Sequence, residues 1–204
     1  MGYKNFQRRS RWTPFIQHNW GPFVLEFRVD NDLIEALLKE GNKSRENNLD
    51  ARKQLAGEIK EEFYYKDYEW FLSAFSNYIS SYLECTGGND KNAWRLDSLW
   101  INYQKANEYN PPHNHTGDLS FVIYLQVPKE IELENEEKEN ERNNAGPGMI
   151  LFDYGQEMPL SIHRIIHMTR TGDAFIFPAW LVHHVYAFKS DVERISVSGN
   201  IFLK

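Results

Sequence analysis

The stretch PPHNHTGDLSFVIYL, residues 111–125, carries two histidines shortly before an apolar run. In an extended segment residues i and i+2 project from the same face, so His113 and His115 can point at one atom while Asn114 points away. This is a spacing that metal ligands use. Asp118 follows a Thr-Gly turn and can bend back toward the same point. The alternative is a polar turn with a hydrogen-bonded imidazole, because His-x-His alone is a weak signal.

The sequence around and after this stretch is typical of short strands. Segments rich in β-branched and aromatic residues are separated by Gly, Pro and Asp. The segments are SLWINYQ, LSFVIYLQVP, GMILFDYG, HRIIHMTR, DAFIFPAW, HHVYAF and RISVSGNIFL. Their number and spacing predict a mainly β fold, either a sandwich or a jelly roll.

Between two of these strands, residues 129–148 contain seven Glu and no aromatic residue. This composition predicts a solvated, mobile insertion.

The N-terminal part has helical patterns instead. Apolar residues repeat at spacings of three and four in 33–38 and in 67–84, with Gly41 expected to end the first helix. Residues 41–66 are predicted as a loop that leads into a short helix. We therefore expect a single domain over 1–204, in which a helical part (1–90) buttresses a β core (91–204).

A second histidine group lies in GDAFIFPAWLVHHV, residues 172–185. Gly172 and Asp173 make a turn, and a strand with alternating Phe residues ends at Pro178. His183 and His184 then face opposite sides of the next strand, and we favour His183 as the one that faces the interior.

The last strand, RISVSGNIFL (194–203), alternates polar and apolar residues. Arg194 and Ser196 share one face, with Ser198 and Asn200 farther along it. In an ordinary half-exposed strand this face is simply the solvent face. Inside a barrel the same residues suit a carboxylate ligand, because Arg offers a two-pronged donor and Ser adds a hydroxyl.

In this order the motifs resemble the Fe(II)/2-oxoglutarate oxygenase superfamily, and in particular the prolyl-4-hydroxylase-like oxygenases common in marine phages and bacteria. The resemblance covers residues 94–203 and rests on SLWINYQ, PPHNHTGDLSFVIYL, FIFPAWLVHHV and RISVSGN. It implies a double-stranded β-helix (jelly roll) with Fe(II) as metal and 2-oxoglutarate as cosubstrate.

It also implies residue roles: His183 as the distal metal ligand, and Arg194 with Ser196 on the remote carboxylate of 2-oxoglutarate. Tyr124 is expected on that same carboxylate, and Asn102 or Tyr103 in the same pocket.

The sequence departs from the family in the proximal motif. The usual pattern is His-x-Asp/Glu, whereas this chain has His113-Asn114-His115. Three histidines can hold the metal, His115 can pair with Asp118, or water or chloride can fill the position. A neutral ligand in place of an anionic one leaves more positive charge on the iron, and a free position can suit halogenation, so hydroxylation and halogenation both stay open.

Two other functions compete with an oxygenase. A cupin-type metalloprotein shares the barrel and the paired histidines but uses no 2-oxoglutarate, and a non-catalytic jelly-roll module needs neither ligand. Arg194 and Ser196 favour the oxygenase, which would use O2 to hydroxylate a peptide or small molecule and release succinate.

Composition limits the partners and the compartment. The net charge of -6 argues against a nucleic-acid partner, and no apolar run is long enough for a membrane span. Residues 1–20 lack the apolar core of a signal peptide. Cys85 is the only cysteine, which excludes a cysteine-based zinc site and agrees with a reducing compartment. We therefore expect a cytoplasmic protein.

Overall fold

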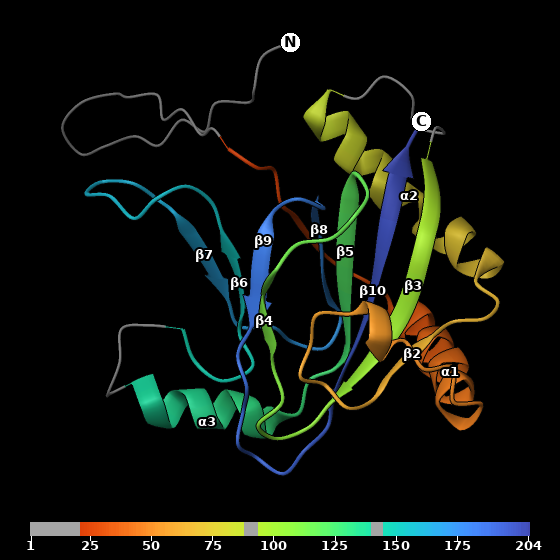
Figure 1. Cartoon of the computed structure of the whole chain (residues 1–204), viewed down its shortest axis with the longest axis horizontal. Coiled ribbons are helices and arrows are strands. Elements are labelled where there is room, and N and C mark those ends of the chain that lie inside the picture. Colours follow the sequence, from red (N-terminus) through yellow and green to blue (C-terminus); the bar gives the residue numbers. More distant parts are fainter. Residues whose placement is uncertain (1–20, 88–93, 140–144) are drawn as a thin grey trace.

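Two antiparallel sheets face each other in this computed structural model, which describes residues 21–87, 94–139 and 145–204 (Figure 1). The six-stranded sheet has the order β1-β8-β5-β10-β3-β2, and the four-stranded sheet has the order β4-β9-β6-β7. The six-stranded sheet contains β1 (Leu25–Arg28), β2 (Glu62–Tyr64), β3 (Trp94–Gln104), β5 (Leu119–Gln126), β8 (Asp173–Pro178) and β10 (Arg194–Leu203). The four-stranded sheet contains β4 (Asn110–His113), β6 (Ile150–Asp153), β7 (Arg164–His167) and β9 (Val182–Val185).

Every strand pair in both sheets is antiparallel. The chain passes repeatedly from one sheet to the other, so strands distant in sequence, such as β3 and β10, become neighbours. This is the predicted jelly roll, with helices added from the N-terminal part.

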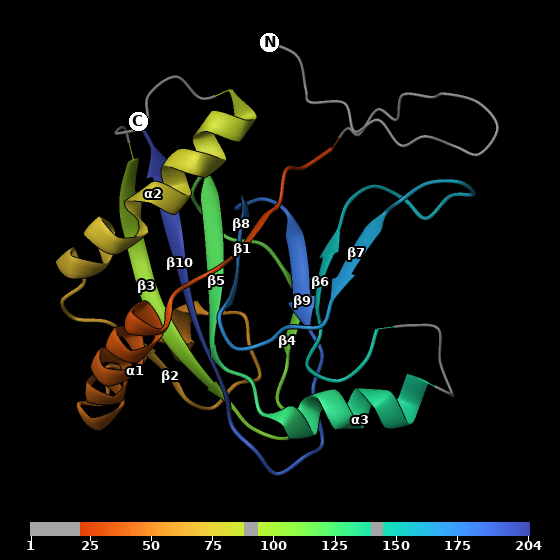
Figure 2. The same cartoon turned by 180° about the vertical axis from the view of Figure 1, so that it is seen from behind.

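Two helices cover the outer face of the larger sheet, α1 (Asn31–Glu46) and α2 (Glu69–Thr86) (Figures 1 and 2). The α2 residues Phe71 and Phe75 stack on Phe121 of β5, with ring centroids 5.6 and 4.6 Å from it. Ile195 and Val197 of β10 belong to the same hydrophobic core. The apolar alternation of β10 therefore points toward the helices, and its polar face points toward the smaller sheet. That polar face lies inside the barrel and is not the solvent face.

The prediction that Gly41 ends the first helix is wrong, because α1 continues to Glu46. A Cβ atom at Gly41 would lie 2.3 Å from Ile101 Cδ1 and 2.9 Å from the Tyr65 hydroxyl. Glycine here allows the helix to approach the sheet closely. The following segment forms a short 3-10 helix (Arg52–Gln54) and strand β2, so a loop leading into a short helix describes only part of it.

The acidic insertion is also corrected, since residues Lys129–Glu139 form helix α3. Ile131 is fully buried, and the Glu134 carboxylate accepts hydrogen bonds from the backbone N–H groups of Lys189 and Ser190 at 2.8 and 3.1 Å. These contacts fasten the first part of the insertion to the loop before β10. The rest of the predicted insertion includes residues 140–144, which lie outside the described residues.

Within the described residues, no helix is long and apolar enough to cross a lipid bilayer.

Candidate functional site

Three histidines meet at one end of the space between the sheets. His113 ends β4 and is the register partner of His183 on β9, while His115 follows two residues later. The ring centroid of His113 lies 4.4 Å from that of His183 and 4.9 Å from that of His115. One nitrogen of each ring lies within 4.8 Å of the others, which makes this a group that could hold a metal ion.

The backbone turn after β4 directs His115 into this group. The His115 N–H donates to the Ala179 carbonyl at 2.8 Å, which ties the turn to the segment before β9. Gly117 has a φ of +105°, and a Cβ atom there would lie 2.9 Å from the Ile201 carbonyl oxygen. The Thr-Gly turn therefore needs glycine for both its conformation and its contact with β10.

Hydrogen bonding sets the tautomer of two of the three rings. His113 Nδ1 lies 2.7 Å from the Pro111 carbonyl oxygen, and His183 Nδ1 lies 3.0 Å from that of Leu181. Because a carbonyl only accepts, each Nδ1 carries the proton and donates it. The Nε2 lone pairs are then free for a metal, which is how a second contact commonly orients a histidine ligand.

Burial keeps these rings uncharged. It lowers the pKa of His115 to about 4 and that of His183 to about 3, with repulsion between the imidazoles adding to the effect. Burial also lowers the pKa of His113. Metal binding requires neutral imidazole, so at neutral pH the group is already in the binding form.

The structure separates the other two metal candidates from this group. Asp118 is exposed, and its carboxylate accepts the Leu203 N–H at 2.8 Å. His184 points to the opposite side of β9 from His183, as the alternation predicts, and its Nδ1 lies 3.3 Å from the Asp153 carboxylate. Neither side chain lines the pocket described next.

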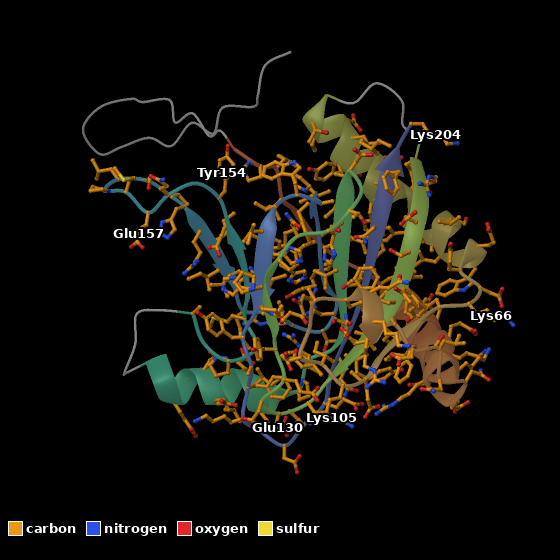
Figure 3. The ribbon with its side chains drawn as sticks, viewed as in Figure 1. Lys66, Lys105, Glu130, Tyr154, Glu157 and Lys204 are labelled. Carbon is orange, nitrogen blue, oxygen red and sulfur yellow. The ribbon has the colours of Figure 1, made fainter. Side chains whose placement is uncertain are left out.

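A pocket with an empty volume of about 570 Å³, including the part open to solvent, extends from the three histidines between the sheets. Side chains fill most of the space between the two sheets (Figure 3). Tyr154 and Glu157 lie on the β6–β7 hairpin, which projects away from that space. Trp100 lines the pocket, whereas Trp180 does not and is about half exposed. The lining includes all four residues predicted for the cosubstrate, namely Asn102, Tyr124, Arg194 and Ser196.

Among the residues that the structure describes, the buried cation Arg194 has no acidic partner. Its guanidinium donates to the Gly148 carbonyl at 2.6 Å and to the Gln104 side-chain oxygen, while its Nε has no partner. Burial lowers the pKa of Arg194, and no carboxylate offsets that effect. A buried charge is normally paired, so this end of the pocket has an unfilled requirement for an anion.

The strand register gathers further polar groups beside Arg194. Ser196 is the register partner of Asn102 on β3 and of Tyr124 on β5. The Tyr124 hydroxyl and Asn102 Oδ1 are buried and have no hydrogen-bond partner among the described residues, and Asn102 Nδ2 lies 3.4 Å from Ser196 Oγ. Tyr103, the alternative to Asn102, faces the helix side, where its hydroxyl donates to Asn42 at 2.8 Å.

Three polar residues of this region were not predicted from the sequence. Gln104 holds Arg194, and Glu62 and Asn110 line the pocket. For Gln104 a signal existed, because it follows Asn102 by two residues on the same strand face. Glu62 belongs to a strand of only three residues, too short for an alternation to be recognised.

The chain matches a known protein family and several solved structures. A family model described as "Putative 2OG-Fe(II) oxygenase" matches residues 98–200, which is about half of the chain and includes all three histidines and Arg194. The chain belongs to this family. It is an oxidoreductase that uses Fe(II) and 2-oxoglutarate, as the sequence motifs predicted. Membership favours this oxygenase over the cupin and over a non-catalytic module.

Solved structures share the fold at low sequence identity. A viral collagen prolyl hydroxylase from Paramecium Bursaria Chlorella virus-1, in complex with 2-oxoglutarate, is 14% identical, with a TM-score of 0.56 over 89% of this oxygenase and 96% of that chain. A Pseudomonas putida prolyl-4-hydroxylase is 14% identical, with a TM-score of 0.57 over 89% and 92% of the two chains.

The carbocyclase SnoK from nogalamycin biosynthesis is 15% identical, with a TM-score of 0.59 over 89% and 79% of the two chains. A comparison with curated protein sequences gave no match. The structural matches confirm the jelly roll.

Proposed function

We propose that His113, His115 and His183 hold Fe(II) through imidazole nitrogens alone, with no carboxylate from the protein. The support is their mutual distance, their uncharged state and the hydrogen bonds that leave Nε2 of His113 and His183 free. Asp118 is not the third ligand in this proposal, because its carboxylate already accepts the Leu203 N–H outside the group. Three neutral ligands leave the full positive charge of the metal in the pocket, which favours binding of a dianion such as 2-oxoglutarate.

We further propose that Arg194 binds the remote carboxylate of 2-oxoglutarate, assisted by Ser196 and Tyr124, with Asn102 beside them. The observation that carries this proposal is the buried Arg194, which lacks an acidic partner and lies in the same pocket as the histidines. The Tyr124 hydroxyl and Arg194 Nε are buried donors without acceptors, and a carboxylate would satisfy both. A cupin or an inert module has no use for such a group.

In this proposal the chain orients the reactants and keeps water away from them. When bound, Fe(II) and 2-oxoglutarate would supply the chemistry of the family, in which O2 oxidises the substrate while 2-oxoglutarate becomes succinate and CO2. Arg194 fixes one end of the cosubstrate, the histidines fix the metal at the other end, and Phe177 and Ile150 close the pocket with apolar surface. Hydroxylation of a peptide or a small molecule is the reaction that we propose.

Anaerobic titration with Fe(II) tests the metal assignment. We expect His183→Ala to lose Fe(II) binding and all succinate formation, whereas His184→Ala, its neighbour on the opposite strand face, retains both. Thermal unfolding of both variants checks that they remain folded. Equal loss of Fe(II) affinity in the two folded variants would contradict the assignment.

A further inference from the structure

The pocket contains a second ionisable group at a distance from Arg194. Glu62 begins β2, the edge strand of the larger sheet, and its side chain lines the pocket. The residue is only 2% exposed, yet no described residue donates a hydrogen bond to its carboxylate. Arg52, whose charge lowers the pKa of Glu62, already forms an ion pair with Asp50, and the charge of Glu108 raises that pKa. Burying a carboxylate without a hydrogen-bond donor costs folding stability, which indicates that this side chain has a function.

Two amide side chains place an oxygen in the neighbourhood of Glu62. Asn102, its register partner on β3, has a buried Oδ1 without a partner. Both Asn110 Oδ1 and Glu62 Oε1 lie near Gly57, because a Cβ atom added there would be 2.5 Å from the first and 3.5 Å from the second. Glycine at this position keeps the corner between the two side chains open. The corner therefore brings together acceptor oxygens of Glu62 and Asn110.

Opposite charges divide the pocket into two ends. Arg194 and Glu62 form no ion pair with each other, and neither has an electrostatic effect on the pKa of the other. A dicarboxylate is attracted to Arg194 and gains no such attraction at Glu62, so 2-oxoglutarate is expected to leave the Glu62 end free. Apolar residues Leu55, Ala56 and Ile59 line the pocket beside that end. These features suit a ligand with a cationic head and an apolar stem.

We propose that Glu62, with Asn110, binds a cationic donor group of the substrate, so that this oxygenase acts on a molecule carrying an amine or a guanidine. The inference rests on the proposed function, since it takes the histidines and Arg194 as the sites of metal and cosubstrate. Burial raises the pKa of Glu62 to about 7, and a bound cation would supply the missing partner and favour the ionised carboxylate.

Matched pairs of cationic and neutral probes test this proposal. The full chain is loaded anaerobically with Fe(II) and 2-oxoglutarate, and binding is followed by isothermal titration calorimetry. Methylguanidinium is compared with methylurea, and arginine with citrulline, because each pair differs mainly in charge. We expect the cation of each pair to bind about tenfold or more tightly, given the strength of hydrogen bonds to charged groups.

Two variants and one control show whether the preference for the cationic probe depends on Glu62. Glu62→Gln keeps the shape and removes the charge, so the preference for the cation should fall to near unity while 2-oxoglutarate affinity is unchanged. Gly57→Ala should weaken binding of both members of each pair by filling the corner. Glu61→Gln is the control, because Glu61 pairs with Arg45 and Lys105 outside the pocket, and it should retain the preference.

The outcomes separate this inference from the proposed function. If Fe(II) and 2-oxoglutarate bind normally but the wild type does not discriminate within either pair, the Glu62 assignment is wrong and the cosubstrate site stands. The same holds if Glu62→Gln retains the full preference. If 2-oxoglutarate does not bind at all, the proposed function fails first.

Discussion

Replacing Arg194 with lysine should weaken 2-oxoglutarate binding while Fe(II) binding persists. Lysine retains the positive charge but has three donors and no planar fork, so it cannot make a two-pronged bond to a carboxylate while it donates to Gly148 and to Gln104. A hydrogen bond to a charged group contributes about 1.5–3 kcal/mol, and 1.4 kcal/mol corresponds to one decade of affinity. The loss of one such bond predicts about a 10- to 100-fold weaker 2-oxoglutarate affinity.

The affinity is measured by anaerobic titration of 2-oxoglutarate into the Fe(II)-loaded protein, followed by the visible absorbance of the complex. Arg170→Lys is the matched control, because Arg170 is an exposed arginine paired with Glu132 far from the pocket lining. Melting temperatures show whether the loss of the Gly148 and Gln104 contacts has unfolded the variant. An unchanged 2-oxoglutarate affinity in folded Arg194→Lys and Arg194→Ala would refute the cosubstrate assignment.

Three further predictions follow from particular contacts. Asp118→Ala should leave Fe(II) affinity unchanged in titration but lower stability by about 0.5–1.5 kcal/mol in urea unfolding, because it removes the acceptor for the Leu203 N–H; a large loss of Fe(II) affinity would restore Asp118 as a ligand. Gly41→Ala should destabilise the fold by about 1–3 kcal/mol, since its Cβ atom would meet Ile101 at 2.3 Å, and an unchanged urea midpoint would contradict the tight helix packing. The pKa of Glu62 rises from 4.5 to about 7 in the fold, so the unfolded state releases this proton at lower pH than the folded state does. The stability of the wild type relative to Glu62→Gln should therefore fall between about pH 4.5 and 7, by at most about 3 kcal/mol. Urea-unfolding stabilities of the two proteins that change in parallel with pH would show that this carboxyl is not perturbed.

Local periodicity predicted much of the barrel and of its site. Alternation along β10 assigned Arg194 and Ser196 to one face, and the same rule separated His183 from His184 on β9. The two-residue spacing of His113 and His115 brought both rings to one point. These inferences succeeded because each depends on the backbone of a single strand, whose side-chain directions follow from its extended conformation.

The features that the sequence did not predict depend on contacts between distant segments. Helix α3 has little apolar periodicity. It is held by the buried Ile131 and by Glu134, whose carboxylate accepts hydrogen bonds from the backbone N–H groups of Lys189 and Ser190. Glycine occupies position 41 inside a helix because Ile101 and Tyr65 leave no room for a side chain there. Glu62 reaches the pocket only because β2 pairs with β3. None of these neighbours is close in sequence, so no local pattern could indicate them.

A crystal structure grown without oxygen in the presence of Fe(II) and 2-oxoglutarate tests the central claim most directly. The account predicts one metal ion bound by a nitrogen of each of His113, His115 and His183, with the remote carboxylate of 2-oxoglutarate on Arg194. A metal ion held by Asp118, or a cosubstrate that does not touch Arg194, would contradict it.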